Sequence, residues 1–229
     1  MSASLALSVD QGFAAVEATF ARAPSAPASF PQSSVGGPAR NFTADSEIYA
    51  EGDDANCFYK IVSGVVRTCK FLSDGRRQID AFHVAGDVFG FETGAEHRLS
   101  AEAVSDCTLI PYRRRGFEVL AGRDDRVAGQ LFSYAMRCLE RAQEHSLLLG
   151  RRSASQKLAT FLLEMVDRRC GNEVIDLAMT RQDIADYLGL TIETVSRTLS
   201  QLERDGVISL PSARRVCLKD HRALRHLNS

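Results

Sequence analysis

The 229-residue chain lacks any apolar run that approaches the roughly 20 residues needed for a membrane-spanning helix. It also opens without a basic segment ahead of an apolar stretch, which is the pattern of a secretory signal. These two absences predict a cytoplasmic protein with no membrane partner. Apolar residues make up 45% of the chain and charged residues 25%, as in ordinary globular proteins, and the length favours two domains.

Metal-binding and catalytic motifs are also missing. The six cysteines are scattered, with no CxxC pair and no local cluster with histidine, which argues against a zinc knuckle or a disulfide scaffold. The chain contains no GxSxG, HExxH, GxxxxGKS or GxxxxGKT sequence, so these nucleophile, zinc and phosphate-loop sites are excluded. We therefore expect no catalytic residue, no metal site, no cofactor and no enzyme activity.

The net charge of −1 is unevenly distributed along the chain. Residues 151–229 carry 13 Lys and Arg against 10 Asp and Glu, whereas residues 1–150 carry 15 against 19. The C-terminal third is therefore basic and the remainder acidic. Because a basic segment is the electrostatic signature of nucleic-acid binding, we expect double-stranded DNA to bind the C-terminal part.

The first part of the chain and the segment after it differ in pattern. Four of the six prolines lie between residues 24 and 38 in a stretch without charge, which predicts a flexible arm over residues 1–40. Over residues 41–122, short apolar runs such as 58–62 alternate with Gly and Asp turns such as 73–75. This spacing predicts a compact antiparallel β unit, either a roll or a barrel.

A long helix is predicted over residues 123–150. Apolar or small side chains recur there at spacings of three and four over about three heptads. The pattern predicts a helix that pairs with its counterpart in a homodimer. The alternative is a single helix that packs this stripe on its own domain. The residues of the predicted dimer seam are Ala128, Leu131, Ala135, Cys138, Ala142, His145 and Leu149.

The segment from Thr180 to Leu210 predicts a helix-turn-helix. Thr180 can cap the first helix with Asp183 at its third position, and Gly189 can form the turn. Thr191 can cap the second helix, whose apolar residues recur at helical spacing. Polar side chains remain free in the first two turns of this second helix, which is the end that approaches base edges in a major groove.

The polar residues of this motif match the chemistry of DNA. An arginine can donate two hydrogen bonds to guanine, a glutamate can accept from cytosine, and a serine can contact a base or the thymine methyl group. The predicted base-reading residues are Glu193, Ser196 and Arg197. Helix N-termini can hold phosphates, and the predicted phosphate-binding residues are Thr180, Arg181, Gln182, Thr191 and Thr194. A hairpin over residues 207–218 would complete a winged helix-turn-helix over residues 151–229.

These motifs resemble those of the CRP/FNR superfamily of transcription regulators over residues 42–229. The matching stretches are TRQD at 180–183, ETVSR at 193–197 and LERDGVI at 202–208. The resemblance implies an α+β fold with an N-terminal antiparallel β-roll, a long dimerisation helix and a C-terminal winged helix-turn-helix. It also implies a homodimer that binds a palindromic operator and contacts RNA polymerase as an activator.

Within the superfamily, the E-x-x-S-R pattern is similar to that of the FNR branch. This similarity implies a site of the type TTGAT-N4-ATCAA. It also implies that Glu193 and Arg197 read the G·C pair and that Ser196 reads the neighbouring T.

The ligand residues of the sensing branches are replaced. Phe91 stands where the cyclic-nucleotide branch has the glutamate for the ribose hydroxyl, and Leu99 stands where it has the arginine for the phosphate. The first 56 residues contain no cysteine, so they lack the N-terminal ligands of the FNR iron–sulfur cluster. His83 and His97 could suggest haem, but a histidine in a β-roll is more commonly solvated or hydrogen-bonded.

This combination resembles the FixK-like subgroup, which has the FNR-type DNA motif without the cluster. The resemblance implies control of microaerobic or anaerobic respiration or of nitrogen-fixation genes without a bound effector. The alternative is a CRP/FNR-type regulator that is gated by a small ligand, by haem or by thiol redox chemistry.

Overall fold

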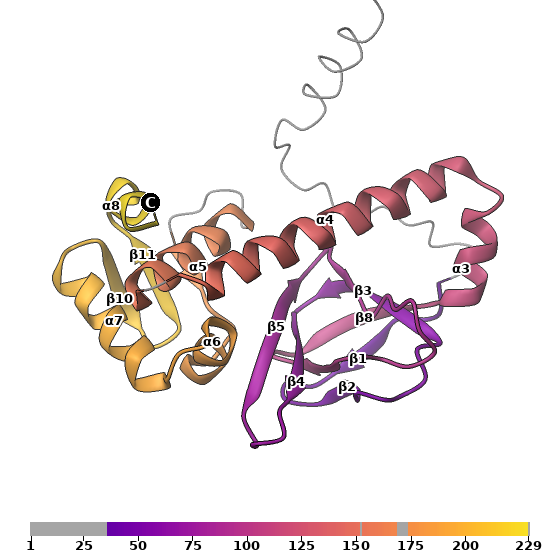
Figure 1. Ribbon diagram of the computed structural model, residues 1–229, viewed down its shortest axis with the longest axis horizontal. Helices are drawn as coiled ribbons and strands as arrows, with labels where there is room; N and C mark the ends of the chain where they lie inside the picture. Colours follow the sequence, from indigo (N-terminus) through magenta and orange to yellow (C-terminus); the bar gives the residue numbers. More distant parts are fainter. Residues whose placement is uncertain (1–35, 152, 169–173, 229) are drawn as a thin grey trace, which may run out of the picture.

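A computed structural model describes residues 36–151, 153–168 and 174–228 (Figure 1). A β-rich unit, a long helix and a helical C-terminal unit follow one another along the chain, which confirms the α+β class. The predicted arm over residues 1–40 lies almost wholly outside the described residues. None of the helices in the described part is long and apolar enough to cross a membrane.

Two antiparallel four-stranded sheets form the β-rich unit, which is the roll that the CRP/FNR resemblance implied. Its strands are β1 (Arg40–Phe42), β2 (Glu47–Tyr49), β3 (Cys57–Ser63), β4 (Val65–Phe71), β5 (Arg77–Val84), β6 (Val88–Phe89), β7 (Ser100–Ala103) and β8 (Cys107–Arg113). One sheet has the order β1-β8-β3-β6 and the other the order β2-β7-β4-β5. Strands β4 and β5 form a hairpin at the edge of the second sheet.

The roll is held together by apolar side chains between its sheets. Ile61, Val66, Phe89 and Leu109 are almost fully buried and belong to one cluster with side chains from both sheets. Full burial of one such side chain contributes about 1.5 to 3 kcal/mol to stability. The cluster therefore fixes the sheets against each other.

Helices α3 (Arg114–Ala121) and α4 (Asp125–Leu149) follow the roll. One face of α4 packs on its own chain, where the Tyr134 hydroxyl donates to the Val88 carbonyl oxygen at 2.7 Å. The residues of this face, spaced by three and four, are Val127, Leu131, Tyr134, Cys138, Arg141, His145 and Leu148.

The predicted dimer seam is therefore divided between two faces of α4. Leu131, Cys138 and His145 are half-buried on the intramolecular face, whereas Ala135 and Ala142 are exposed. The reason is that α4 carries two apolar stripes one residue out of register, and the sequence pattern merged them. The exposed large apolar side chains of α4 are Phe132, Met136, Leu139, Leu147 and Leu149.

The C-terminal unit is a winged helix-turn-helix, as predicted. Its elements are α5 (Ala154–Arg168), β9 (Val174–Asp176), α6 (Arg181–Leu188), α7 (Ile192–Arg204), β10 (Ile208–Ser212), β11 (Arg215–Leu218) and α8 (His221–Asn228). Strands β10 and β11 form the antiparallel wing, and β9 adds to the free edge of β11. Helix α8 was not predicted from the sequence.

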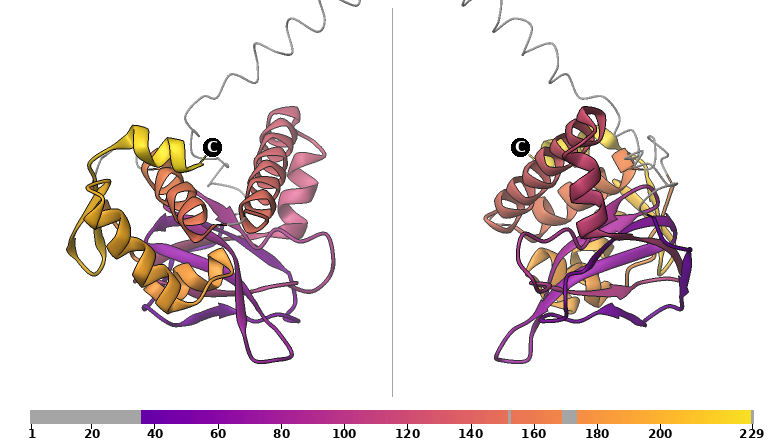
Figure 2. Two further views of the ribbon diagram at one scale, coloured as in Figure 1. Left: turned by 60° about the vertical axis from the view of Figure 1, so that its left-hand side comes forward. Right: turned by 90° about the vertical axis from the view of Figure 1, so that its right-hand side faces the viewer.

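The roll and the C-terminal unit share one apolar core. The ring of Phe82 in β5 lies 5.2 Å from that of Tyr187 in α6 and 6.4 Å from that of Phe161 in α5, measured between centroids. Ile79 and Val104 of the roll belong to the same cluster of buried side chains. Both views in Figure 2 show the orange C-terminal helices against the purple strands. The C-terminal unit is therefore packed on the roll, not merely tethered to it.

His83 of β5 lies near the junction between the roll and the C-terminal unit. Its ring stacks on Phe89 with centroids 5.4 Å apart, and Nε2 lies 3.1 Å from the Thr68 hydroxyl. Burial lowers the pKa of His83 to about 4, although the nearby Asp87 carboxylate acts in the opposite direction. The ring is therefore neutral at pH 7.

We expect the free energy of unfolding to fall as the pH drops from 6.5 towards about 4, because the unfolded chain then protonates His83 while the folded chain does not. Since one pKa unit corresponds to about 1.4 kcal/mol, the loss should reach roughly 2 to 3 kcal/mol. Urea unfolding across this pH range measures it, and His83→Gln should remove this part of the dependence. The same pH dependence in both proteins would contradict the assignment.

Candidate DNA interface

Helix α6 begins with the reciprocal cap that the sequence predicted. The Thr180 hydroxyl accepts the N–H of Asp183 at 3.1 Å, and the Asp183 carboxylate accepts the N–H of Thr180 at 2.9 Å. Gly189 ends the helix in the left-handed region at φ +61°, a conformation that favours glycine. Both ends of the first helix of the motif are therefore fixed by local contacts.

Helix α7 begins at Ile192, three residues after Gly189. The Thr191 hydroxyl accepts the N–H of Thr194 at 3.2 Å, which confirms the predicted cap. Val195, Leu199 and Leu202 are buried in the shared core. The apolar side of the helix is thereby attached to the C-terminal unit, and the opposite side faces solvent.

Glu193, Ser196 and Arg197 are all exposed in the first two turns of α7. Residues three and four apart lie on the same face of a helix, so the three side chains form one patch. Backbone hydrogen bonding at its own N–H and a bond from the Thr191 hydroxyl lower the pKa of Glu193, which is therefore ionised at pH 7. The patch thus offers a carboxylate acceptor, a hydroxyl and a guanidinium donor.

The predicted phosphate-binding residues lie at the N-terminal ends of α6 and α7, namely Thr180, Arg181, Gln182, Thr191 and Thr194. Some of their polar groups already have partners. The Gln182 amide donates to Asp186 at 2.6 Å, and the hydroxyls of Thr191 and Thr194 lie 3.0 Å apart. Arg181 is partly buried, and its Nη1 has no hydrogen-bond partner among the described residues.

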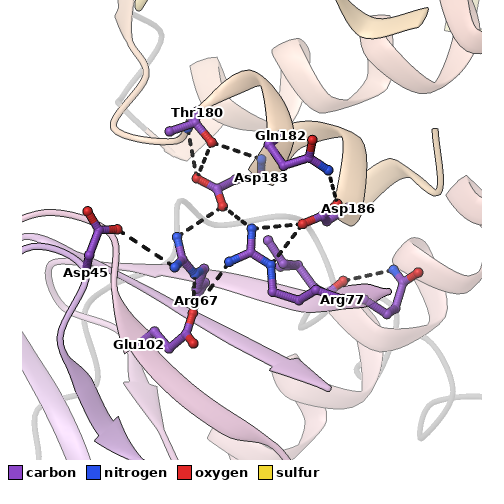
Figure 3. Close-up of polar contacts among 10 residues, drawn as sticks. Asp45, Arg67, Arg77, Glu102, Thr180, Gln182, Asp183 and Asp186 are labelled. Carbon is purple, nitrogen blue, oxygen red and sulfur yellow. Dashed lines mark hydrogen bonds and ion pairs between the residues drawn. The ribbon is translucent and has the colours of Figure 1, made fainter. Parts of the chain in front are cut away.

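A different side of α6 contacts the β4–β5 hairpin through charged residues that the sequence analysis missed (Figure 3). The Asp183 carboxylate accepts from Arg67 at 3.0 Å and from Arg77 at 2.6 Å. Asp186 accepts from Arg77 Nε at 2.9 Å, and Glu102 of β7 accepts from Arg67 Nε at 2.6 Å. We call Arg67, Arg77, Glu102, Asp183 and Asp186 the α6–roll network.

Asp183 and Arg77, the central pair of the α6–roll network, keep their charges at pH 7. Burial alone would raise the pKa of Asp183, but the hydrogen bonds from Thr180 and the charges of Arg67 and Arg77 outweigh it and lower the pKa. Burial likewise opposes the charge of Arg77, but Asp186 and Asp183 raise its pKa. The network is therefore a set of ion pairs between the roll and the DNA-binding motif.

The C-terminal end of α6 is held by helices α4 and α5. The His145 ring stacks on Tyr187 with centroids 4.2 Å apart, and its Nε2 lies 2.9 Å from the Tyr187 carbonyl oxygen. The Lys157 ammonium donates to the Leu188 carbonyl oxygen at 3.0 Å. The negative end of the helix dipole also stabilises a cation at this position. These contacts explain why His145 packs within the chain.

Aromatic rings pack on Phe91 and His97, two residues of the roll that the sequence analysis considered as possible ligand positions. Phe91 lies 4.9 Å from Phe58 and 6.3 Å from Phe117 between ring centroids. His97 stacks on Tyr49 at 3.6 Å. Within the described ranges, the structure contains no group of three or more His, Cys, Asp and Glu residues that could hold a metal ion.

Two family models match the chain, a Crp-like helix-turn-helix domain over residues 156–227 and a cyclic nucleotide-binding domain over residues 39–124. The nitrogen fixation regulation protein FixK of Azorhizobium caulinodans is 52% identical over 194 residues, which cover 82% of this chain and 78% of that protein. The chain belongs to the CRP/FNR family of transcription regulators. This membership confirms the resemblance found in the sequence.

A second sequence relative and a solved structure support the same family membership. FixK of Rhizobium meliloti is 42% identical over 181 residues, covering 79% of this chain and 82% of that protein. The solved structure of FixK2 from Bradyrhizobium japonicum superposes with a TM-score of 0.81 at 46% identity, covering 85% of this chain and 98% of that one. This CRP/FNR chain is thus a DNA-binding transcription regulator of the FixK type and not an enzyme.

Proposed function

We propose that this regulator reads a palindromic operator of the type TTGAT-N4-ATCAA and acts there as an activator. The observation that carries the proposal is the exposed patch of Glu193, Ser196 and Arg197 on α7. Arg197 would donate two hydrogen bonds to guanine, Glu193 would accept from the paired cytosine, and Ser196 would contact the neighbouring thymine. The resemblance of this pattern to the FNR branch supports the half-site.

Binding to the DNA backbone would come from the N-terminal ends of α6 and α7. Unpaired backbone N–H groups and the positive end of the helix dipole both favour phosphate at such ends. The residues that we assign to phosphate contacts are Thr180, Arg181, Gln182, Thr191 and Thr194. Their contacts would position the protein without reading sequence.

A palindromic operator calls for two copies of the chain, and the exposed face of α4 offers their contact. Phe132 is 67% exposed and Leu139 is 50% exposed on this helix. With Ala128, Ala135 and Ala142 they follow the spacing of a coiled-coil seam, which we call the dimer stripe. Two-fold pairing would place the recognition helices about 34 Å apart, in successive major grooves. The bound dimer would then contact RNA polymerase.

We further propose that the protein needs no bound effector. Phe91 packs among aromatic rings, and His97 is stacked on Tyr49, so these residues already have partners inside the chain. Two relatives are named as nitrogen fixation regulation proteins. We infer that this regulator controls microaerobic or anaerobic respiration or nitrogen-fixation genes and acts in the cytoplasm.

The alternative is a regulator gated by an effector, and one observation favours it. A cavity of about 690 Å³ lies between the roll and the C-terminal unit, lined by Val65, Met165, Ile175 and Arg214 among others. Cavities of this size commonly hold small ligands. A ligand that copurifies with the protein, or a haem or flavin absorption band, would distinguish this alternative from the effector-free regulator.

Substitutions of Arg197 and Arg181 should distinguish base reading from phosphate binding. Arg197→Ala should weaken binding to the cognate operator by about 1 to 3 kcal/mol and binding to a site with the G·C pair changed by much less. Arg181→Ala should weaken both sites alike and reduce the salt slope by about one unit, because one fewer counterion is released. Titrations of both DNAs at several salt concentrations measure this. If Arg197→Ala weakens both sites equally, its base-reading role is wrong.

The dimer stripe is tested by placing a charge in it. Leu139→Glu should convert the dimer to a monomer in sedimentation and abolish operator binding, because a carboxylate cannot be buried without a partner. Val62→Glu is the control, since Val62 on β3 is also 50% exposed but lies outside the stripe. A wild-type protein that sediments only as a monomer, with and without operator, would refute the dimer.

Effector independence predicts that the purified protein binds its operator in air, without cyclic nucleotide and in the presence of a metal chelator. Added cyclic AMP should leave the dissociation constant unchanged, because the residues for its ribose and phosphate are absent. Electrophoretic mobility shift titrations measure both. A requirement for cyclic AMP, or loss of a coloured cofactor together with binding, would contradict the proposal.

A further inference from the structure

The position of α7 depends on the position of α6. Residues 189–191 form the short turn between the two helices, and both helices contribute to the shared core. Figure 1 shows α6 between α7 and the β4–β5 hairpin. Any rotation of α6 on the roll would therefore move the exposed patch of α7 relative to the dimer stripe.

The α6–roll network supplies the directional contact between these parts. Arg77 binds both Asp183 and Asp186, which lie three residues apart on one side of α6. Aliphatic contact such as that of Ile79 and Val104 in the shared core resists separation, but it has no preferred direction. A planar guanidinium that bridges two carboxylates one turn apart fixes the rotation of the helix about its own axis.

The arginines are themselves held on the roll side. Glu102 accepts from Arg67 at 2.6 Å and lies 3.5 Å from Arg77. The side chain of Asp183 is only 2% exposed, so salt screens these pairs weakly. A shift of α6 that breaks one of these pairs while the site stays closed would leave a buried charge without a partner, which is strongly unfavourable.

We propose that Arg67 and Arg77 are positioning residues for DNA recognition, which hold α6 on the roll in the orientation that presents α7 to the operator. The inference rests on the proposed role of α7 in reading DNA. It adds that the roll, and not a ligand, sets this orientation. Both arginines contact a side of α6 other than its junction with α7, so they act on DNA only through the helix.

A pair of neighbouring arginines provides the test. Arg77→Gln removes the contacts to Asp183 and Asp186. Arg76→Gln removes the same charge one residue away, but Arg76 pairs with Asp74 inside the hairpin turn and makes none of the network contacts. The operator is the palindrome that the wild-type dimer selects from a random DNA pool. Failure to select any palindrome would count against the proposed function, whereas the variants test the positioning role.

Each protein is titrated with this operator, with versions whose half-sites are one base pair closer or farther apart, and with non-specific DNA. Arg77→Gln should lower affinity for the selected operator by about tenfold or more, the scale of a lost charged hydrogen bond. It should also reduce the preference for the selected spacing and leave non-specific affinity unchanged. Arg76→Gln should behave like the wild type on every DNA.

Two results would overturn the positioning role. One is an Arg77→Gln protein with wild-type affinity and spacing preference. The other is an equal loss on operator and non-specific DNA. Asp186→Asn removes only the ion pair between Arg77 and Asp186, whose carboxylate is less buried than that of Asp183. It should also reduce the preference for the selected spacing. Adding it to Arg77→Gln should have no further effect, because the pair is already lost. If Arg77→Gln fails to fold, an unchanged spacing preference in Asp186→Asn overturns the proposal.

Discussion

The arrangement of the DNA-binding unit depends on one buried carboxylate. Asp183 uses one oxygen to close the cap of α6 with Thr180 and the other to accept from Arg67 and Arg77. A carboxylate can accept about four hydrogen bonds, so both roles fit on a single side chain. The carboxylate that closes the cap of the first helix of the motif therefore also joins the motif to the roll.

Apolar and polar contacts have different roles at the junction between the roll and the C-terminal unit. The cluster around Phe82, Phe161 and Tyr187 removes apolar surface from water and thereby holds the units together. The ion pairs restrict the geometry, because their strength depends on the direction of each donor and acceptor. Helix α4 contributes both kinds of contact, since Leu148 belongs to the apolar cluster and His145 Nε2 lies 2.9 Å from the Tyr187 carbonyl oxygen.

The parts that were predictable from the sequence depend on residues close together in the chain. The cap of α6 spans the four residues 180–183, the glycine turn is a single position, and the patch on α7 covers residues 193–197. Each has a local pattern with a physical cause, so sequence reasoning found them. The order of roll, long helix and winged motif followed from the same kind of pattern together with the family resemblance.

The parts that were missed depend on distant residues or on ambiguous periodicity. Arg67 and Asp183 are 116 positions apart, and nothing in the sequence around a charged strand residue names its partner. The residues of the predicted seam fall on two faces of α4, because a spacing of three and four fits either of two adjacent stripes, and the sequence does not show which stripe packs on the roll. The short helix α8 begins just after Asp220, in a stretch with few apolar residues.

The shared core has a consequence for how such a chain can evolve. The interior of the roll around Ile61 and Phe89 is a cluster separate from the shared core, so its residues can change without direct contact with the C-terminal unit. The β4–β5 hairpin has no such freedom, because Ile79 and Phe82 complete the core of the C-terminal unit. The roll is thus a scaffold as well as a domain in its own right, and its removal would leave the winged unit with an incomplete interior.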